Sequence, residues 1–236
     1  MTPNFHPIRA ASGGKPVAGC GATDDVRVIF PLSFRPLQCS TMLAQMIRGG
    51  LTMTMIDGGA KGDFHSVLGT SGRSPEIPES MDAYGWLVGS WELDVLHFWL
   101  DVAERHIKGE AHFGWVLEGR AVQDVWIMPR RSERNVDIDK TMNMYGTTLR
   151  VWDSSIRAWR ITWTNPAGDY HEQQTGGWGG ESGKDVVQLG TRADGTRTRW
   201  SFTEITPDSF HWLGEAMQPD GKTWKLEGEF RAKRMR

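Results

Sequence analysis

The chain has 236 residues, which is enough for one domain of good size or for a domain with a long extension. Its formal net charge of −2 argues against proteins that hold nucleic acid through a strongly basic surface. No apolar run reaches the roughly 18 residues that a membrane-spanning helix requires. The two cysteines, Cys20 and Cys39, cannot supply a disulfide framework for the rest of the chain.

The first 84 residues differ in composition from the remainder. Every one of the 12 tryptophans lies at or after Trp86, whereas seven of the 11 prolines precede Ser80. A Gly-, Pro- and Ser-rich segment without sustained periodicity buries too little apolar surface to offset the entropy lost on ordering. We therefore predict a disordered or weakly structured extension over residues 1–84 and a folded domain over 85–236.

Three short features lie inside this extension. Residues 17–20, VAGC, resemble a lipoprotein cleavage site, but the preceding residues are polar, so we expect a cytoplasmic protein. Ser40 could cap a helix over 41–48, and a transient helix in a tail is favoured over a lid or docking helix. Because later methionines offer alternative starts, we hypothesise that part of the extension is absent from the natural protein; these are Met42, Met46, Met53, Met55 and Met81.

From Trp86 onward, apolar and polar residues alternate with the period of two that indicates β-strands. In the first strand, Trp91, Leu93 and Val95 share one face. About ten such strands follow one another at spacings of 8–14 residues, nearly all separated by short turns. Short turns make neighbouring strands antiparallel, so the pattern predicts an all-β, up-and-down antiparallel barrel. A two-sheet sandwich is the alternative, although it usually needs longer connections.

The triplet Gly89-Ser90-Trp91 and a late arginine resemble the calycin superfamily of lipocalins, fatty-acid-binding proteins and nitrobindin-like barrels. The resemblance implies that Trp91 packs under an arginine of the last strand and closes the base of the barrel. Arg231 is the first candidate for that arginine, and Lys233 and Arg234 compete with it. The segments GRAVQDVWIMP, YGTTLRVWDSSIRAWRITWTNP, RWSFTEITPDSFHWLGEA and DGKTWKLEGEF resemble an uncharacterised bacterial calycin-like family, which implies a fold and no activity.

Aromatic residues crowd the later strands. A barrel of eight or more strands can hold one small ligand, and ligand pockets are mainly apolar with a few polar groups. We therefore expect a small-molecule binding protein with a largely apolar or aromatic ligand, in which Arg150 or Arg160 anchors an anionic group. The expected lining residues are Trp152, Trp159, Trp163, Trp200, Phe202 and Trp212. The alternative for each tryptophan is a packed core with cross-strand aromatic pairs.

A metal-independent enzyme in the same cavity is the second hypothesis, for example a cyclase, isomerase or hydrolase. His171 or His211 would then act as acid and base, and Glu204 or Glu215 would be its partner. Each of the four could instead lie on the solvent face, because a period of two does not reveal which face is inside.

A haem protein or a structural homodimer without a ligand is the third hypothesis. In nitrobindin-like barrels one histidine holds haem, and the candidates here are His171, His211 and, behind them, His112. The first-strand motif lacks the further glycines that this resemblance would imply. Residues 85–236 contain no cysteine and no histidine pair spaced for zinc, so we predict no metal site and no cofactor.

Overall fold

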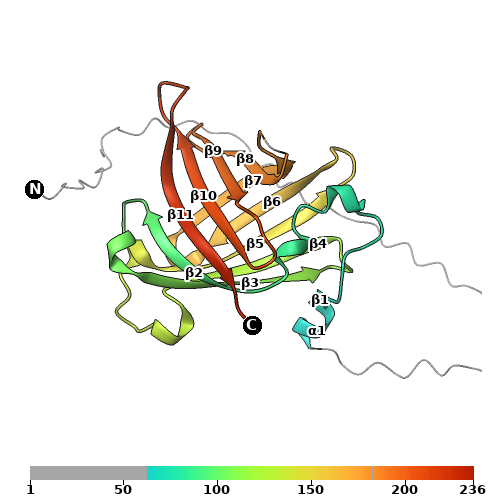
Figure 1. Cartoon of the computed structure of the whole chain (residues 1–236), viewed down its shortest axis with the longest axis horizontal. Helices are drawn as coiled ribbons and strands as arrows, with labels where there is room; N and C mark the ends of the chain where they lie inside the picture. Colours follow the sequence, from blue (N-terminus) through green and yellow to red (C-terminus); the bar gives the residue numbers. More distant parts are fainter. Residues whose placement is uncertain (1–62, 182) are drawn as a thin grey trace, which may run out of the picture. The chain divides into compact units, whose positions relative to one another are not determined.

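Ten antiparallel strands close into one barrel in the computed structural model, which describes residues 63–181 and 183–236 (Figure 1). Each strand pairs with its neighbour in the sequence, and pairing of the first with the last closes the ring. The barrel strands are β2 Gly89–Phe98, β3 Ile107–Val116, β4 Ala121–Met128, β5 Met144–Asp153, β6 Ala158–Asn165, β7 Tyr170–Gly179, β8 Asp185–Thr191, β9 Arg197–Thr203, β10 Ser209–Met217 and β11 Trp224–Arg234. The predicted up-and-down barrel is confirmed.

Short elements precede the barrel and occupy its connections. The helix α1 covers Phe64–Leu68, and the two-residue strand β1, Gly69–Thr70, pairs with the end of β3. Single 3₁₀ turns are η1 Glu79–Met81, η2 Gly85–Leu87, η3 Ala103–Arg105, η4 Arg131–Glu133, η5 Lys140–Met142 and η6 Pro166–Gly168. Among the described residues, no helix has the length and apolar character needed to cross a membrane.

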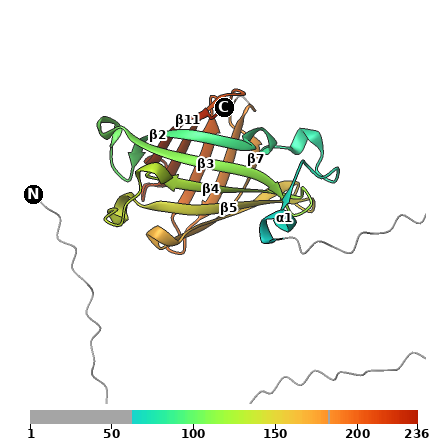
Figure 2. The same cartoon turned by 90° about the horizontal axis from the view of Figure 1, so that it is seen from below.

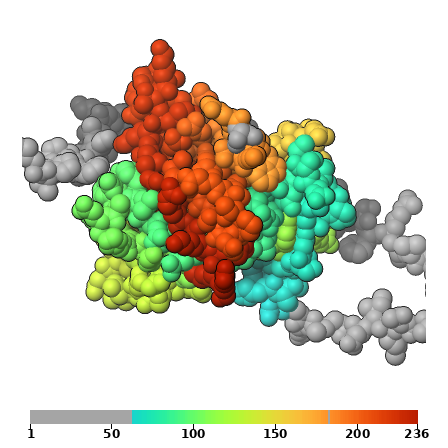
Figure 3. Space-filling model, viewed as in Figure 1, coloured from blue at the N-terminus to red at the C-terminus, as the bar shows by residue number. Residues whose placement is uncertain are grey.

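Alternation of side chains along each strand separates the inside of the barrel from its outer wall. Trp91, Leu93 and Val95 of β2 are buried inside, while Glu92 and Asp94 between them reach Lys108 on the outer wall. Seen from below, β2 to β5 run side by side across one wall (Figure 2). The hairpin between β10 and β11 projects beyond the body of the molecule (Figure 3).

The end of the barrel at Gly89 is called the base, and the opposite end is called the mouth.

The segment just before β2 closes the base. Ile77 and Tyr84 are almost completely buried, and the carbonyl of Met81 accepts a hydrogen bond of 2.8 Å from the indole N–H of Trp159. Residues 74–84 belong to the stretch for which the sequence predicted weak structure. The burial of Ser74, Ile77, Ala83 and Tyr84 makes this segment part of the packed unit. The rest of the predicted extension, with the expected helix over 41–48, lies outside the described residues.

An arginine of the last strand does pack on Trp91, as the resemblance implied, but it is Arg234. Its guanidinium carbon lies 4.1 Å from the centre of the Trp91 ring. It donates hydrogen bonds of 2.7–2.8 Å to the carbonyls of Trp86, Val88 and Pro207. This latch therefore joins the segment before β2 to the turn between β9 and β10.

The first candidate, Arg231, is wrong for this role. Phe230 and Ala232 of β11 point inward, so alternation carries Arg234 to the inner face and places Arg231 on the outer wall. There its side chain is 51% exposed and pairs with Glu204 at 2.8 Å.

We predict that Arg234→Ala lowers the free energy of unfolding by about 2–3 kcal/mol, because three carbonyls lose a charged donor. The matched variant Arg231→Ala should change it by less than about 0.5 kcal/mol, because exposed ion pairs contribute little. Urea unfolding followed by tryptophan fluorescence measures both values. Equal losses in the two variants would contradict the latch.

Candidate functional site

The inner face of the barrel carries most of the aromatic side chains. Seven of the eight predicted ligand-binding residues lie on this face or are packed into it: Trp152, Trp159, Trp163, Trp200, Phe202, Trp212 and Arg150. They divide into two groups along the barrel. Trp159 and Phe202 are completely buried near the base, where the segment before β2 covers them.

A second group of rings lies nearer the mouth. Trp163 and Trp200 retain 7% and 9% exposure, and Trp212 is only partly buried. The ring centres of Trp163 and Trp200 are 6.3 Å apart, and those of Trp200 and Trp212 are 5.7 Å apart, with steep angles between the planes. We call these three residues the aromatic wall. Because they face inward and still reach solvent, they can contact a small molecule.

Glycines beside two of these rings leave room for them against the strands. A Cβ atom at Gly146 would lie 2.4 Å from the Trp163 ring, and one at Gly214 would lie 2.6 Å from the Trp212 ring. Gly228, the register partner of Gly214, lies against the same edge of this ring, where an added Cβ atom would be 3.0 Å from it. Any side chain at Gly146 or Gly214 would push a ring toward the centre of the barrel, so the missing side chains shape the interior.

A polar belt lies deeper, between the aromatic wall and the base. Arg150 donates to Asp124 at 2.5 Å, and both side chains are almost fully buried. The other carboxylate oxygen of Asp124 accepts from the backbone N–H of Thr148 at 2.6 Å. The Arg150 guanidinium carbon lies 5.1 Å from the centre of the Tyr84 ring. Burial raises the pKa of Tyr84, while Arg150 and the Gln188 side chain act in the opposite direction, so this phenol stays protonated.

Several polar atoms of this belt have no hydrogen bond of ordinary geometry within the described part of the chain. They are the Tyr84 hydroxyl, Arg150 Nε, Gln174 Oε1 and both amide atoms of Gln188. Buried polar groups are almost always paired, with protein, water or ligand. The sequence identified only Arg150 here. Tyr84 lay in the predicted extension, and single polar residues inside strands carry no signal that separates the two faces.

A second polar cluster lies at the mouth, around the carboxylate of Glu172. It accepts hydrogen bonds from the hydroxyls of Tyr170 and Thr198 and, at 2.8 Å, from the Gln174 amide. Arg192 Nε lies 3.6 Å away. Burial and the neighbouring carboxylate both raise the pKa of Tyr170. Because donors from the protein already occupy its carboxylate oxygens, Glu172 stabilises the mouth of the barrel and has few lone pairs left to accept a hydrogen bond from a ligand.

Arg192 connects this cluster to the rim of the mouth. It donates two hydrogen bonds to Glu227, at 2.5 and 3.2 Å. Its guanidinium carbon lies 5.5 Å from the ring centre of Trp99 and 5.6 Å from that of Tyr170. Trp99 is 48% exposed, in the connection between β2 and β3. The arginine therefore ties that connection to the wall beside the aromatic rings.

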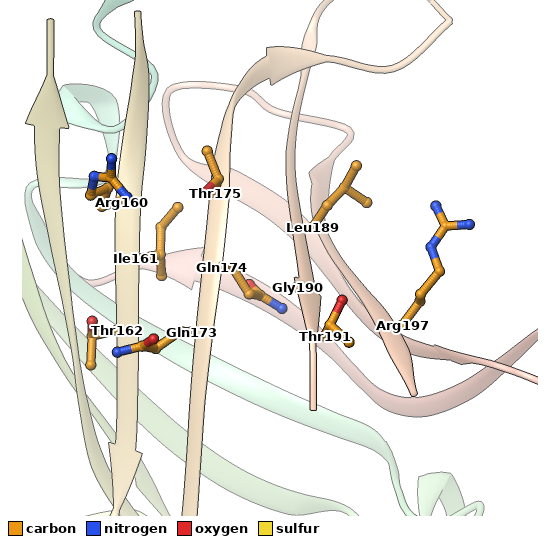
Figure 4. Close-up of a pocket in the computed structure, with 10 residues that line it drawn as sticks. All are labelled: Arg160, Ile161, Thr162, Gln173, Gln174, Thr175, Leu189, Gly190, Thr191 and Arg197. Atoms are coloured by element: carbon orange, nitrogen blue, oxygen red, sulfur yellow. The ribbon is translucent and has the colours of Figure 1, made fainter. Parts of the chain in front are cut away.

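Arg160, the second predicted anchor, points away from the interior. Its side chain is 62% exposed and pairs with Asp153 at 2.6 Å, so an anchoring role inside the barrel is wrong for this residue. Figure 4 shows it at the edge of an open groove of about 480 Å³ over β6 to β9. The groove is lined by Arg160, Ile161, Thr162, Gln173, Gln174, Thr175, Leu189, Gly190, Thr191 and Arg197.

The predicted acid–base residues also lie on the outer wall. His211 has Glu229 at 2.8 Å and Glu204 at 3.4 Å, but Phe210 and Trp212 on either side of it are the residues that face inward. His171 is exposed beside Thr164. Glu215 pairs with Arg199 at 2.8 Å. The structure therefore places none of the four residues inside the barrel, and acid–base chemistry by them at that place is wrong. Strand alternation turns His171, His211 and Glu215 outward, and Glu204 lies exposed in the turn after β9.

His112, the remaining haem candidate, lies on the outer wall as well. Ser90 Oγ is 2.8 Å from its Nδ1, and Glu110 is 3.3 Å from its Nε2. Arg131 also approaches Nε2, at 3.2 Å, and pairs with Glu110 at 2.6 Å. Although partial burial acts in the opposite direction, hydrogen bonds from Arg131 and His112 lower the pKa of Glu110 to about 2.

Within residues 63–181 and 183–236, no three His, Cys, Asp or Glu side chains are grouped so as to hold a metal ion. No protein-family model matches the chain, and no curated protein matches it. The fold and the interior geometry therefore carry the functional argument.

Proposed function

We propose that this protein binds one small, largely apolar or aromatic molecule inside the barrel, against Trp163, Trp200 and Trp212. The observation that carries the proposal is the state of these three rings. They face inward, they retain contact with solvent, and two of them lie where only glycine leaves them room. Aromatic side chains with a few polar groups beside them are the usual lining of small-molecule sites.

Membership of the calycin superfamily is part of the same proposal. The ten-stranded antiparallel barrel agrees with it, and so does the arginine of the last strand that packs on Trp91. Barrels of this size can enclose a single small ligand, which supports binding inside rather than on the outer wall.

Titration with a panel of aromatic and aliphatic compounds tests the proposal. The panel should contain neutral, anionic and cationic members, and isothermal titration calorimetry should be combined with tryptophan fluorescence. We expect at least one compound to bind with 1:1 stoichiometry and to change the fluorescence, because the ligand contacts indole rings.

Two glycine variants test whether the ligand binds inside the barrel. In Gly214→Ala the new methyl group would meet the Trp212 ring at 2.6 Å and push it into the interior. We expect binding to weaken by at least about tenfold, which is 1.4 kcal/mol. A methyl group in Gly114→Ala on β3 meets no atom within 4 Å, so this variant should bind normally. If the whole panel leaves both signals unchanged, or if the two variants bind equally, the proposal is wrong.

A further inference from the structure

Three polar side chains without complete hydrogen bonding converge at one level of the interior. Tyr84, Arg150 and Gln188 are each at most 2% exposed. The Arg150 guanidinium lies against the Tyr84 ring, and both Arg150 and the Gln188 amide act on the Tyr84 hydroxyl. Gln188 is also the register partner of Trp200 in the aromatic wall. A molecule resting against Trp200 would therefore lie next to Gln188, which in turn lies against Tyr84, and Tyr84 against Arg150.

The free-energy cost of burying these polar groups without full hydrogen bonding indicates that a further molecule supplies the missing hydrogen bonds. A buried polar group without a partner costs about 1–3 kcal/mol. The Gln188 amide lies against the Tyr84 hydroxyl, and the rest of its hydrogen-bonding capacity, like Arg150 Nε, has no partner within the part of the chain that the structure describes. An apolar residue at this position would avoid the cost, so the glutamine is better suited to contacting a polar guest than to packing.

Formal charge at this level is already balanced. Arg150 is the cation, and Asp124 is its buried counter-ion at 2.5 Å. A carboxylate guest would add a second anion close to Asp124, and an ammonium guest would add a second cation close to Arg150. Each would also lose its hydration, which costs several kcal/mol for a buried ion without a partner of its own. Guests of either charge are therefore disfavoured relative to a neutral one.

The free positions offer both donors and acceptors. Arg150 Nε–H can only donate, the Gln188 amide can do both, and the Tyr84 hydroxyl can do both. A primary amide or a lactam matches this set, because it donates and accepts through adjacent atoms without carrying charge.

We infer that the ligand carries a neutral amide-like group, held by Gln188, Tyr84 and Arg150, and an aromatic or apolar body against Trp200. This inference rests on the proposed function and defines its ligand class. It replaces the expectation that Arg150 anchors an anionic group, because Asp124 already neutralises that arginine.

Three compounds with the same phenyl body test the inference at pH 7: phenylacetamide, phenylacetate and 2-phenylethylamine. They present a neutral amide, an anion and a cation. We expect calorimetry with the full-length protein to show the amide binding at least about tenfold more tightly than either charged compound.

Variants of two glutamines locate the preference. Gln188→Leu should remove the preference for the amide, because leucine can neither donate a hydrogen bond to the guest nor accept one from it. Gln173→Leu, on the exposed outer face of β7, should keep the preference. Urea unfolding of both variants excludes misfolding as the cause of lost binding.

Each other outcome has a definite meaning. Tighter binding of phenylacetate or of 2-phenylethylamine overturns the inference and leaves the proposed function intact. The same holds if other aromatic or aliphatic compounds bind but none of these three does, or if Gln188→Leu keeps the preference. If no compound of the wider panel binds at all, the proposed function fails together with the inference.

Discussion

Arg150→Met is expected to lower the free energy of unfolding by about 3–5 kcal/mol, because it leaves Asp124 charged and buried without its counter-ion. Both side chains lie in the interior, where a lone carboxylate has lost its hydration and has gained only one backbone donor, Thr148 N–H. Methionine is close to arginine in length, so loss of packing contributes little. Guanidinium unfolding at pH 7, followed by circular dichroism, measures the effect.

The double variant Arg150→Met with Asp124→Asn separates charge from packing. Asparagine keeps an oxygen that can accept the Thr148 N–H but carries no charge, so most of the lost stability should return. The double variant should therefore be more stable than Arg150→Met alone. A loss below about 1 kcal/mol in the single variant would show that water reaches Asp124 and that the pair is not desolvated.

Trp159→Ala is expected to destabilise the protein by about 3–5 kcal/mol, the usual cost of removing a fully buried large aromatic side chain. This ring packs against Tyr84 with 5.0 Å between centres, and its N–H is bound by the Met81 carbonyl at 2.8 Å. Removal of the ring should therefore release the segment that closes the base. Chemical denaturation gives the free energy, and limited proteolysis reports cleavage between residues 74 and 88.

Trp178→Ala provides a control for this variant, because Trp178 is 41% exposed at the same end of the barrel. It should lose less than about 1 kcal/mol and leave the 74–88 segment resistant to protease. If Trp159→Ala were as stable and as resistant as this control, Trp159 would not be needed for closure of the base.

The candidate site could be predicted from the sequence only in part. Alternation placed Trp159 and Trp163 of β6 on one face of their strand, without showing which face is inside, and the structure places them and the tryptophans of β9 and β10 inside. The same alternation left Arg150 and Arg160 equivalent, although they lie on neighbouring strands with opposite directions of their side chains. The sequence did not predict Gln188 as a site residue, because a glutamine in a strand normally lies on the solvent face.

The sequence by itself determined the approximate strand count and the antiparallel order, because these follow from alternation and from turn residues that are local in the chain. The tertiary structure decided which face is inside, which late arginine reaches Trp91, and that Tyr84 belongs to the interior. Each of these depends on contacts between residues far apart in the chain. Arg234 lies on Trp91 because closure of β11 onto β2 sets the register of the two strands, and no local pattern contains that register.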